Sequence, residues 1–463
     1  MTTEKTGKKE RNVPPTLTVT SECLLSNAPE LLCAAIREQL TVDNPKYTAA
    51  QRYSRWVGKQ IKPRLYFFRE QGDTLVFPRG FGNRAVLLCR RLLGVDPVLI
   101  DRRRKLPPIE CSFQGTLRPY QQEAVQALMQ RSFGVLEAGT GSGKTVMALK
   151  VIAERRQPTI IIVHSRELLE QWLDRIATFL GISAGRAGGG RFDPQPITVA
   201  VVNTARKRLA ELTPCFGQLI VDECHRVPAS LFTEVVSGFD AFYMLGLSAT
   251  AFRREQGMTK LIYSYMGDRV HAVDPDVLTE SGAVVRPDLI QRETAFFASY
   301  SGEYTKLIKA LTENEARNRQ ITADIADLIH QGHEGTVLVV SDRVAHCANL
   351  LDKLRSHHLI AELLTGRMPP DVRADVVCRV QEGKVQVLLS TLQLISEGFD
   401  CPGLSTLVLA TPIRFEGRLL QVVGRIMRPA EGKKALVLDY VDTKISVLQR
   451  SGLARAEMFS RWQ

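Results

Sequence analysis

A glycine-rich loop that ends in a lysine and a threonine is the part of this sequence best suited to chemistry. It spans Ala138–Thr145, between an apolar segment at 133–136 and a helix-forming segment at 146–153. Backbone N–H groups of such a loop can close around a polyphosphate, Lys144 adds a positive charge, and the hydroxyl of Thr145 can bind Mg²⁺. The loop residues expected to line this site are Gly139, Thr140, Gly141, Ser142 and Gly143. The pattern predicts bound ATP or GTP.

The loop departs from the usual phosphate-binding pattern at one position, because Ala138 stands where that pattern has glycine. The alternative is a glycine-rich turn that only joins a strand to a helix. A strand, the Gly-Lys-Thr sequence and a helix follow one another in the required order, which favours the nucleotide site over the turn.

Two adjacent carboxylates, Asp222 and Glu223, end the apolar segment 219–221. The carboxyl ends of strands are where doubly wound sheets bind their ligands. There Asp222 can hold the Mg²⁺ that bridges the phosphates, while Glu223 can orient and deprotonate the attacking water. An acidic pair could instead cap the next helix. Together with the phosphate loop, the pair indicates nucleotide hydrolysis.

Hydrolysis also needs cations near the leaving phosphate, and an arginine can contribute a factor of about 10³–10⁵ to the rate. The segment Gln421–Arg428 offers Arg425 and Arg428, which would lie one turn apart on a helix. These arginines belong to a second α/β region, whereas the phosphate loop belongs to the first. We therefore expect ATP to bind between two cores whose closure changes on hydrolysis.

Apolar segments of strand length alternate with helical patterns along most of the chain, which predicts parallel sheets covered by helices. The first series occupies residues 111–280, with strands expected at 135–136, 159–163, 197–202, 219–221 and 244–247 and helices at 119–131, 166–180 and 229–238. The second series occupies 281–463, with strands expected at 336–340, 385–389, 404–409 and 435–439 and a helix at 314–330. The fold class is α/β.

The N-terminal region carries most of the charge excess. Residues 1–110 hold 20 Lys and Arg against 11 Asp and Glu, which is nine of the chain's net charge of +12. We expect a disordered tail at 1–15 and a small basic α/β domain at 16–110, with helices at 24–40 and 84–93 and strands at 64–68 and 74–78. The basic surface favours nucleic acid as a partner or serves solubility. Tyr66 and Phe68 could stack bases, but we favour an inward, buried orientation for them.

Other classes of protein receive little support. The nine cysteines are scattered without a Cys-x-x-Cys pair, so reduced thiols are expected in place of a zinc or redox site. No apolar run reaches the roughly 18 residues of a membrane span, and the polar, Lys-rich start lacks a signal core. We expect a cytoplasmic protein, associated with the nucleoid or present in a phage-infected cell.

The order of these motifs resembles the superfamily 2 helicases and translocases, in the DEAH-like branch that contains XPB, RecG and UvsW. The resemblance covers residues 113–450, where the acidic motif is Asp-Glu-Cys-His at 222–225. It implies two tandem RecA-like doubly wound parallel-sheet domains behind the basic N-terminal domain. By the same resemblance Gln121 selects ATP, Ser248 and Thr250 couple the nucleotide state to domain movement, Gly398 and Asp400 approach ATP, and Gln421 assists at its phosphates.

The resemblance also implies a set of contacts to the sugar-phosphate backbone of one strand. The candidate residues are Ser165, Arg166, Thr204, Arg343 and Thr391. Such contacts carry no sequence information, so binding should be largely sequence-independent. We expect an ATP- and Mg²⁺-dependent DNA helicase or translocase that acts in repair, recombination or phage defence. A duplex translocase without strand separation, an ATP-gated nucleic-acid clamp and an RNA helicase are the alternatives.

Overall fold

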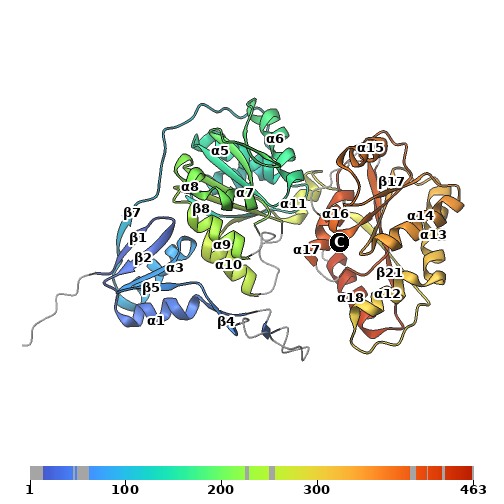
Figure 1. Ribbon diagram of the computed structural model, residues 1–463, viewed down its shortest axis with the longest axis horizontal. Coiled ribbons are helices and arrows are strands. Elements are labelled where there is room, and N and C mark those ends of the chain that lie inside the picture. The colour runs from blue at the N-terminus through green and yellow to red at the C-terminus, as the bar shows by residue number, and fades with distance from the viewer. Residues whose placement is uncertain are drawn as a thin grey trace, which may run out of the picture. The chain divides into compact units, whose positions relative to one another are not determined.

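The computed structural model describes residues 14–44, 47–48, 62–224, 229–249, 256–396, 403–413, 416–429 and 433–460. The chain forms two compact units: the first holds residues up to Ala272, and the second holds residues from Val273 onward together with the short segments Arg118–Tyr120 and Ala138–Lys144 (Figure 1). The first unit contains an N-terminal module and a first α/β core, and the second unit contains a second α/β core. The expected tail at 1–15 lies almost entirely outside the described residues. Among the described residues, each helix is too short or too polar to span a lipid bilayer.

The N-terminal module is a five-stranded sheet with the strand order β5-β6-β2-β1-β7. Its helices α1 and α3 pack against an apolar cluster that includes Leu32, Ile36 and Leu88. The strands are β1 (Thr16–Val19), β2 (Glu22–Ser26), β5 (Arg69–Gln71), β6 (Thr74–Pro78) and β7 (Val98–Asp101), and the helices are α1 (Glu30–Gln39), the 3₁₀ turn η1 (Arg79–Phe81) and α3 (Gly82–Leu93). The helix expected at 24–40 was therefore wrong over its first residues, which form β2.

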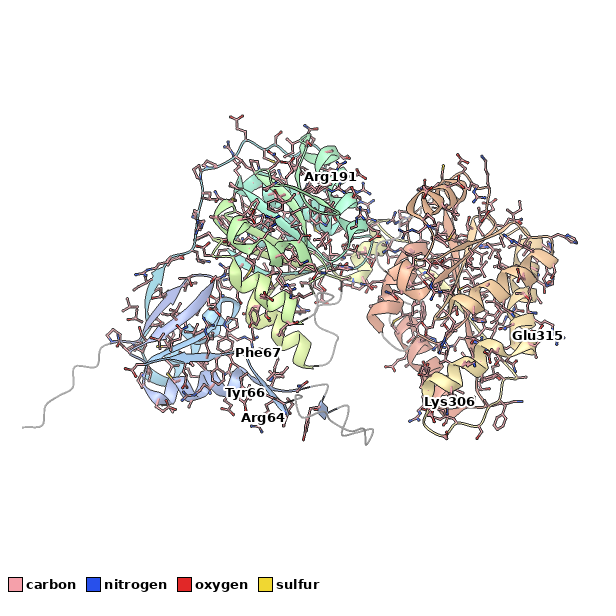
Figure 2. The ribbon with its side chains drawn as sticks, viewed as in Figure 1. Arg64, Tyr66, Phe67, Arg191, Lys306 and Glu315 are labelled. Carbon is pink, nitrogen blue, oxygen red and sulfur yellow. The ribbon has the colours of Figure 1, made fainter. Side chains whose placement is uncertain are left out.

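A separate hairpin of β3 (Thr41–Asp43) and β4 (Arg64–Tyr66) extends from this module. The predicted inward orientation was wrong for Tyr66, which is 57% exposed, whereas Phe68 packs against the apolar cluster as predicted. Phe67 is also partly buried against this cluster and contacts Tyr265 edge to face, with ring centroids 6.4 Å apart (Figure 2). The expected strand at 64–68 breaks after Tyr66, so Phe67 and Phe68 do not continue its alternation.

A buried arginine joins the N-terminal module to the first core. Arg79 is 2% exposed and donates hydrogen bonds to the carbonyl of Ala241 at 2.6 Å and to the sulfur of Met244 at 3.1 Å. Gly80 lies so close to the first core that a Cβ there would come 2.4 Å from the backbone nitrogen of Gly267. Burial lowers the pKa of Arg79 to about 10, so its charge persists at neutral pH.

The segment that follows β7 is held against the first core by backbone hydrogen bonds and a cation–π contact. Arg104 N–H donates to the carbonyl of Asp240 at 2.7 Å, and Ile109 N–H donates to that of Arg156 at 2.8 Å. The guanidinium of Arg103 lies 4.2 Å from the ring centroid of Phe242. These contacts make the basic, proline-containing segment part of the first unit.

The first core is an eight-stranded sheet with the order β11-β10-β12-β9-β13-β14-β8-β15, parallel except for β11. Ile160 and Ile162 face a cluster that contains Phe232 of α9, while Ile161 points to the opposite face and is equally buried. Its strands are β8 (Phe133–Glu137), β9 (Thr159–Val163), β10 (Gly185–Gly188), β11 (Arg191–Asp193), β12 (Ile197–Val201), β13 (Gln218–Val221), β14 (Tyr243–Ser248) and β15 (Arg269–Ala272). Its helices are α4 (Pro119–Met129), α5 (Lys144–Arg155), α6 (Arg166–Leu180), α7 (Val202–Lys207), α8 (Leu209–Leu212), the 3₁₀ turn η2 (Thr213–Cys215), α9 (Ala229–Gly238) and α10 (Gln256–Met266).

The second core is a six-stranded, fully parallel sheet with the order β16-β21-β20-β17-β19-β18. Successive residues of β17 face two different clusters, so both faces of the sheet are buried. Its strands are β16 (Pro287–Glu293), β17 (Thr336–Ser341), β18 (Ala361–Leu364), β19 (Val387–Thr391), β20 (Leu404–Leu409) and β21 (Ala435–Val441). The helices of this unit are α11 (Pro275–Glu280), α12 (Tyr304–Glu313), α13 (Glu315–His330), α14 (Val344–Ser356), α15 (Pro370–Gln381), α16 (Leu392–Ser396), α17 (Glu416–Ile426) and α18 (Ser446–Ser460). The prediction of tandem RecA-like parallel sheets is confirmed.

We predict that Arg79→Met lowers the melting temperature of the first unit by at least about 2 °C. The variant keeps much of the apolar stem but leaves the buried carbonyl of Ala241 without this donor, which costs about 1–3 kcal/mol. The matched control is Arg84→Met, which removes an exposed ion pair to Asp268 across the same interface. Exposed pairs contribute at most about 1 kcal/mol. Differential scanning calorimetry measures both effects, and equal shifts would contradict the assigned role of Arg79.

Candidate functional site

The glycine-rich loop leaves the carboxyl end of β8 and enters α5. Gly141 and Gly143 have φ values of +86° and +80°, a backbone conformation that glycine adopts without the steric cost of a Cβ. The ammonium group of Lys144 donates to the carbonyl of Ala138 at 2.9 Å, so the lysine folds back over its own loop. Such a loop can present backbone N–H groups, a cation and the start of a helix to one anion.

Neighbouring contacts hold this loop in place. The hydroxyl of Tyr120 donates to the carbonyl of Ser142 at 3.0 Å, which fastens the beginning of α4 to the loop. Gln121, the predicted adenine-selecting residue, follows Tyr120 on α4 and is 7% exposed. On α5, Met147, Val151 and Ile152 are buried, so that helix is anchored through its apolar face.

The acidic pair occupies a strained turn directly after β13. Asp222 is buried, and its Oδ1 accepts a hydrogen bond from the N–H of Glu223 at 2.9 Å. Its Oδ2 accepts another from the indole N–H of Trp172 at 2.8 Å. Glu223 has a φ of +45°, a conformation that side chains other than glycine rarely adopt and that is often found at functional sites. His225, the last residue of this motif, lies outside the described residues.

The strand that carries Ser248 lies between the phosphate loop and the acidic turn. β14 pairs with β13 on one side and with β8 on the other, and Ser248 stands opposite Glu137. Cys224 N–H donates to the carbonyl of Leu247 at 3.1 Å, which ties the acidic turn to the end of β14. Since all three strands are parallel, their loops leave the same edge of the sheet. Thr250 lies outside the described residues.

Three residues predicted to contact nucleic acid lie at the same edge of the sheet, after the strands β9 and β12. Ser165 follows β9 and caps α6, where its hydroxyl accepts from Leu168 N–H at 3.3 Å. Arg166 is exposed and lies against Gly189, since a Cβ added there would come 3.0 Å from its Nε. Thr204 lies in α7, which directly follows β12. The structure thus lines up these segments beside the nucleotide motifs.

In the second core, Arg343 and Thr391 lie at the carboxyl ends of adjacent strands. Thr391 ends β19 opposite Ser341 of β17, and Arg343 follows two residues after Ser341. Gln421 and Arg425 lie on α17, where Gln421 is buried and Arg425 is partly exposed. Arg428 lies two residues beyond the end of this helix, so the expectation that both arginines are helical was wrong. Gly398 and Asp400 lie outside the described residues.

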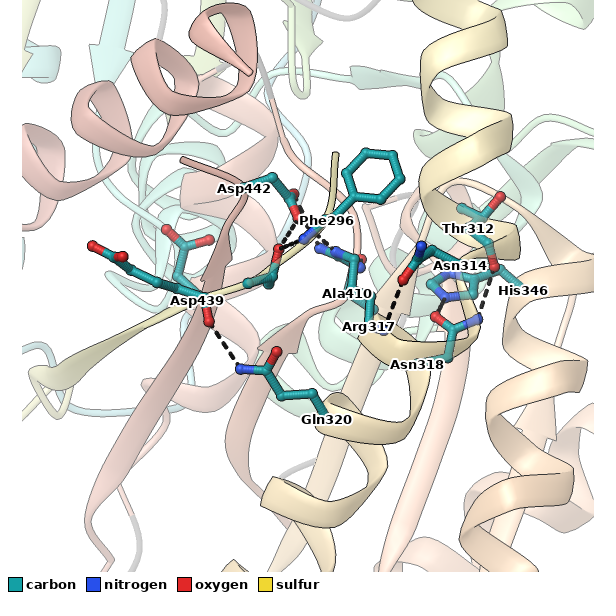
Figure 3. Close-up of polar contacts among 12 residues, drawn as sticks. Phe296, Thr312, Asn314, Arg317, Asn318, Gln320, His346, Ala410, Asp439 and Asp442 are labelled. Atoms are coloured by element: carbon teal, nitrogen blue, oxygen red, sulfur yellow. Dashed lines mark hydrogen bonds and ion pairs between the residues drawn. The ribbon is translucent and has the colours of Figure 1, made fainter. Parts of the chain in front are cut away.

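A buried polar network supports the Arg343 loop, and Figure 3 shows the part of it that His346, Asn318 and Thr312 form. The N–H of Arg343 donates to the hydroxyl of Ser341, which is 2.9 Å from Nδ1 of His346. The other imidazole nitrogen of His346 is 2.9 Å from the side-chain oxygen of Asn318, whose amide donates to the carbonyl of Thr312. The loop is therefore linked to the junction of α12 and α13.

An ion pair with no exposed side-chain surface stands next to this network (Figure 3). Nε of Arg317 lies 2.8 Å from Oδ1 of Asp442, and its NH1 donates to the carbonyl of Ala410 at 2.7 Å. The hydroxyl of Thr294 donates to the same carboxylate at 2.5 Å. Every charge in this cluster has a hydrogen-bonded partner, as burial requires. The pair fastens α13 to the ends of β20 and β21.

Sequence reasoning missed the residues that support the site. The indole of Trp172 and the Arg317–Asp442 pair gave no signal, because their partners are 50 and 125 residues away in the chain. The turn of the β10–β11 hairpin did leave a signal, three consecutive glycines at 188–190 with positive φ. A run of this kind indicates a close approach of the backbone, here to Arg166.

Comparison with known proteins places these motifs in a family. The model of the "Type III restriction enzyme, res subunit" matches residues 114–253, and that of the "Helicase conserved C-terminal domain" matches residues 320–430. The chain belongs to superfamily 2 of the helicases, in the XPB-like branch. It is therefore a nucleic-acid-dependent ATPase.

The helicase is similar to several characterised or named proteins. It is 26% identical over 365 residues to the "DNA 3'-5' translocase XPB2" of Sulfurisphaera tokodaii, covering 70% of this chain and 81% of that protein. It is 26% identical over 419 residues to the "Putative ATP-dependent RNA helicase L396" of Acanthamoeba polyphaga mimivirus, covering 85% and 75%. A fragment structure of a putative HsdR subunit of a type I restriction enzyme from Vibrio vulnificus shares the fold, with a TM-score of 0.58, 21% identity and coverage of 75% and 66%.

We predict that the imidazole of His346 stays neutral between pH 8 and pH 5. Burial, and then the nearby Arg317 guanidinium, lower its pKa from 6.5 to about 3. Because the unfolded chain takes up this proton first, the stability contributed by neutral His346 is complete above pH 6.5 and is lost as pH falls toward 3.

The measurement is an NMR titration of ¹³C-labelled histidines, with the His346 signal identified by its loss in His346→Gln. The chain has eight histidines, so the spectrum can be assigned. A His346 signal that titrates near pH 6.5 would show that the imidazole is accessible to protons and that the network is not sealed.

Proposed function

We propose that this helicase is an ATP-driven motor that moves 3′ to 5′ along one DNA strand and unwinds or remodels duplex or branched DNA. The arrangement of one sheet edge carries the proposal. The phosphate loop, the acidic turn and Ser248 leave the adjacent strands β8, β13 and β14, and the strand-contact segments leave β9 and β12 at the same edge. The nucleotide and the nucleic acid would then both bind at the same edge of one sheet.

The residues at this edge suit Mg²⁺ and ATP. The hydroxyl of Thr145 and the carboxylate of Asp222 are hard oxygen ligands, and Mg²⁺ prefers a few such ligands together with phosphate oxygens and water. When bound, the ion would neutralise charge on the phosphates. Lys144 and the N–H groups of the loop residues would hold the β- and γ-phosphates, and Gln121 would select the adenine.

The remaining side chains of the predicted site would carry out the hydrolysis. Glu223 would accept a proton from the attacking water, which its carboxylate would also orient. Gln421, Arg425 and Arg428 of the second core would stabilise the charge that develops on the leaving phosphate, with Gly398 and Asp400 approaching the nucleotide. Ser248 and Thr250 would couple the nucleotide state to the movement of the cores.

DNA is the track we propose, and the name of the translocase from Sulfurisphaera tokodaii supports both DNA and the 3′ to 5′ direction. The mimiviral relative is named as an RNA helicase, so RNA is the second candidate. Ser165, Arg166, Thr204, Arg343 and Thr391 would contact the sugar-phosphate backbone without reading sequence. DNA repair, recombination or phage defence is the setting that we propose for this activity.

The N-terminal module is proposed as a further DNA contact that moves with the first core. On its β3–β4 hairpin, Arg64 and Tyr66 are exposed (Figure 2), and so is Lys62, two residues before β4. Two cations can neutralise phosphates while the ring stacks on a base. Since Arg79, Arg84 and the segment 103–109 contact the first core, point variants of the hairpin test this better than removal of the module.

We predict that single-stranded DNA stimulates the ATPase activity and that Lys144→Ala and Glu223→Gln abolish it. Loss of the phosphate-binding charge should slow turnover at least about 100-fold. Loss of the general base should slow it about 10²–10⁴-fold while nucleotide binding persists. A coupled-enzyme assay measures turnover with single-stranded, duplex, forked and four-way DNA and with RNA.

Lys150→Ala is the control for these variants, since it removes a lysine from α5 that pairs with Glu154 away from the loop. It should retain wild-type turnover. Turnover that is equal with and without nucleic acid would contradict a motor and support a clamp. Strand displacement together with triplex displacement then separates unwinding from translocation on duplex DNA.

We predict that Lys62→Ala combined with Arg64→Ala weakens DNA binding and flattens its salt dependence. Each phosphate contact contributes a slope of about −0.9 in log K against log salt on B-DNA, so the slope should fall in magnitude by about 2. Fluorescence anisotropy across a salt titration measures it. Arg90→Ala is the control, because Arg90 lies on α3 and its guanidinium pairs closely with Asp96 at 2.8 Å, whereas the pair of Arg64 with Asp43 is longer, at 3.8 Å. An unchanged slope would leave the hairpin outside the DNA contact.

A further inference from the structure

The carboxylate of Asp222 is held from both sides by neutral donors. Its Oδ2 accepts from the indole N–H of Trp172 at 2.8 Å, and its Oδ1 accepts from the N–H of Glu223 at 2.9 Å. Asp222 is 6% exposed and Trp172 is 1% exposed. The hydrogen bond between them is therefore shielded from water.

The indole reaches this position because α6 is anchored along one face. Leu169, Trp172, Ile176 and Leu180 recur at helical spacing and are all buried. An indole has a single donor and no acceptor, so once it is buried its N–H needs an acceptor. Asp222 supplies that acceptor from the end of β13.

This contact restricts the direction of the carboxylate. The final torsion of an aspartate is broad when nothing fixes it. Two donors on opposite oxygens restrict the plane of the group, and a carboxylate oxygen that accepts a hydrogen bond can also bind a cation. A neutral indole also avoids the repulsion that a lysine or arginine in the same place would exert on a divalent ion.

We propose that Trp172 is a positioning residue for the magnesium ligand Asp222. The proposal rests on the proposed function, in which Asp222 binds the ion that accompanies ATP. The indole N–H orients the carboxylate toward that ion without touching it. Because groups that orient a metal ligand affect metal affinity strongly, Trp172→Phe should raise the Mg²⁺ concentration required for nucleotide binding about 10–100-fold.

The alternative is a purely structural role, in which Trp172 fills the core and its N–H donates to Asp222 only because that acceptor is near. In that case Trp172→Phe would reduce thermal stability and leave the Mg²⁺ requirement unchanged. Ile176→Val is the matched control, since it removes one methylene group from the same buried face of α6, four residues further along. It should reduce stability without changing the Mg²⁺ requirement.

The first test uses binding and needs no turnover. A fluorescent, non-hydrolysable ATP analogue is titrated with Mg²⁺ in the full-length wild-type chain and in Trp172→Phe, Ile176→Val and Asp222→Asn. A large shift in Trp172→Phe and none in Ile176→Val supports the proposal. Equal Mg²⁺ requirements in these two variants overturn it.

The wild type and Asp222→Asn separate the two levels of inference. The assignment of Asp222 in the proposed function fails if the wild type binds the analogue equally well with and without Mg²⁺. It also fails if Asp222→Asn leaves the Mg²⁺ requirement unchanged. If wild-type binding depends on Mg²⁺ through Asp222 but Trp172→Phe behaves like Ile176→Val, only the role of Trp172 fails.

A second test reads the indole directly. The chain has three tryptophans, Trp56, Trp172 and Trp462, so replacing the other two by phenylalanine leaves Trp172 as the only indole fluorophore. Its emission should change when Mg²⁺ and the analogue bind together and should stay constant with the analogue in EDTA. Emission that never responds to Mg²⁺ in a protein that binds the complex would overturn the proposal.

Discussion

Parallel strands buried on both faces restrict where this protein can place polar groups. In β9, β12 and β13 almost every side chain is buried, so neither face of the sheet can present a charge to solvent. The carboxyl edge, where backbone groups leave the ladder, remains for loops with special chemistry. Neighbouring strands lie about 4.8 Å apart, so groups at adjacent strand ends are spaced on the scale of a phosphate chain. The backbone of the sheet thus sets the spacing between the groups of the candidate site, whichever side chains occupy the strand ends.

In the second core, buried pairs of opposite charge hold the strand ends in place. Arg317 with Asp442, and Arg455 with Asp439, fasten α13 and α18 to the end of β21. Such pairs repay their desolvation only with good geometry and further hydrogen bonds, and losing one partner costs about 3–5 kcal/mol. Their directional contacts hold the ends of β20 and β21, and β20 pairs with β17, the strand from which the Arg343 loop departs. A purely apolar packing would leave those ends less defined.

Sequence patterns predicted the parts of this structure that depend on local chemistry. The phosphate loop, the acidic turn, the buried strands and helices such as α6 and α9 follow from glycine positions and apolar spacing. The short strand β18 and the polar edge strand β16 lack such a pattern. The inward position of Phe67, the burial of Arg79 and the partner of Trp172 depend on segments far away in the chain. No local preference encodes contacts of that kind, so the support of the site emerged only from the structure.

Helix α6 links the predicted strand contact at its start to the acidic turn, which it contacts near its middle. Ser165 caps the helix beside Arg166, and Trp172 contacts Asp222 from the same helix. Six residues separate Arg166 from Trp172, a rise of about 9 Å along the axis. A helix anchored by four buried side chains moves as one body, so neither contact can shift while the other stays in place unless α6 unwinds. The segment predicted to contact the nucleic-acid strand and the acidic turn are therefore joined through α6, although 56 residues separate Arg166 from Asp222 in the sequence.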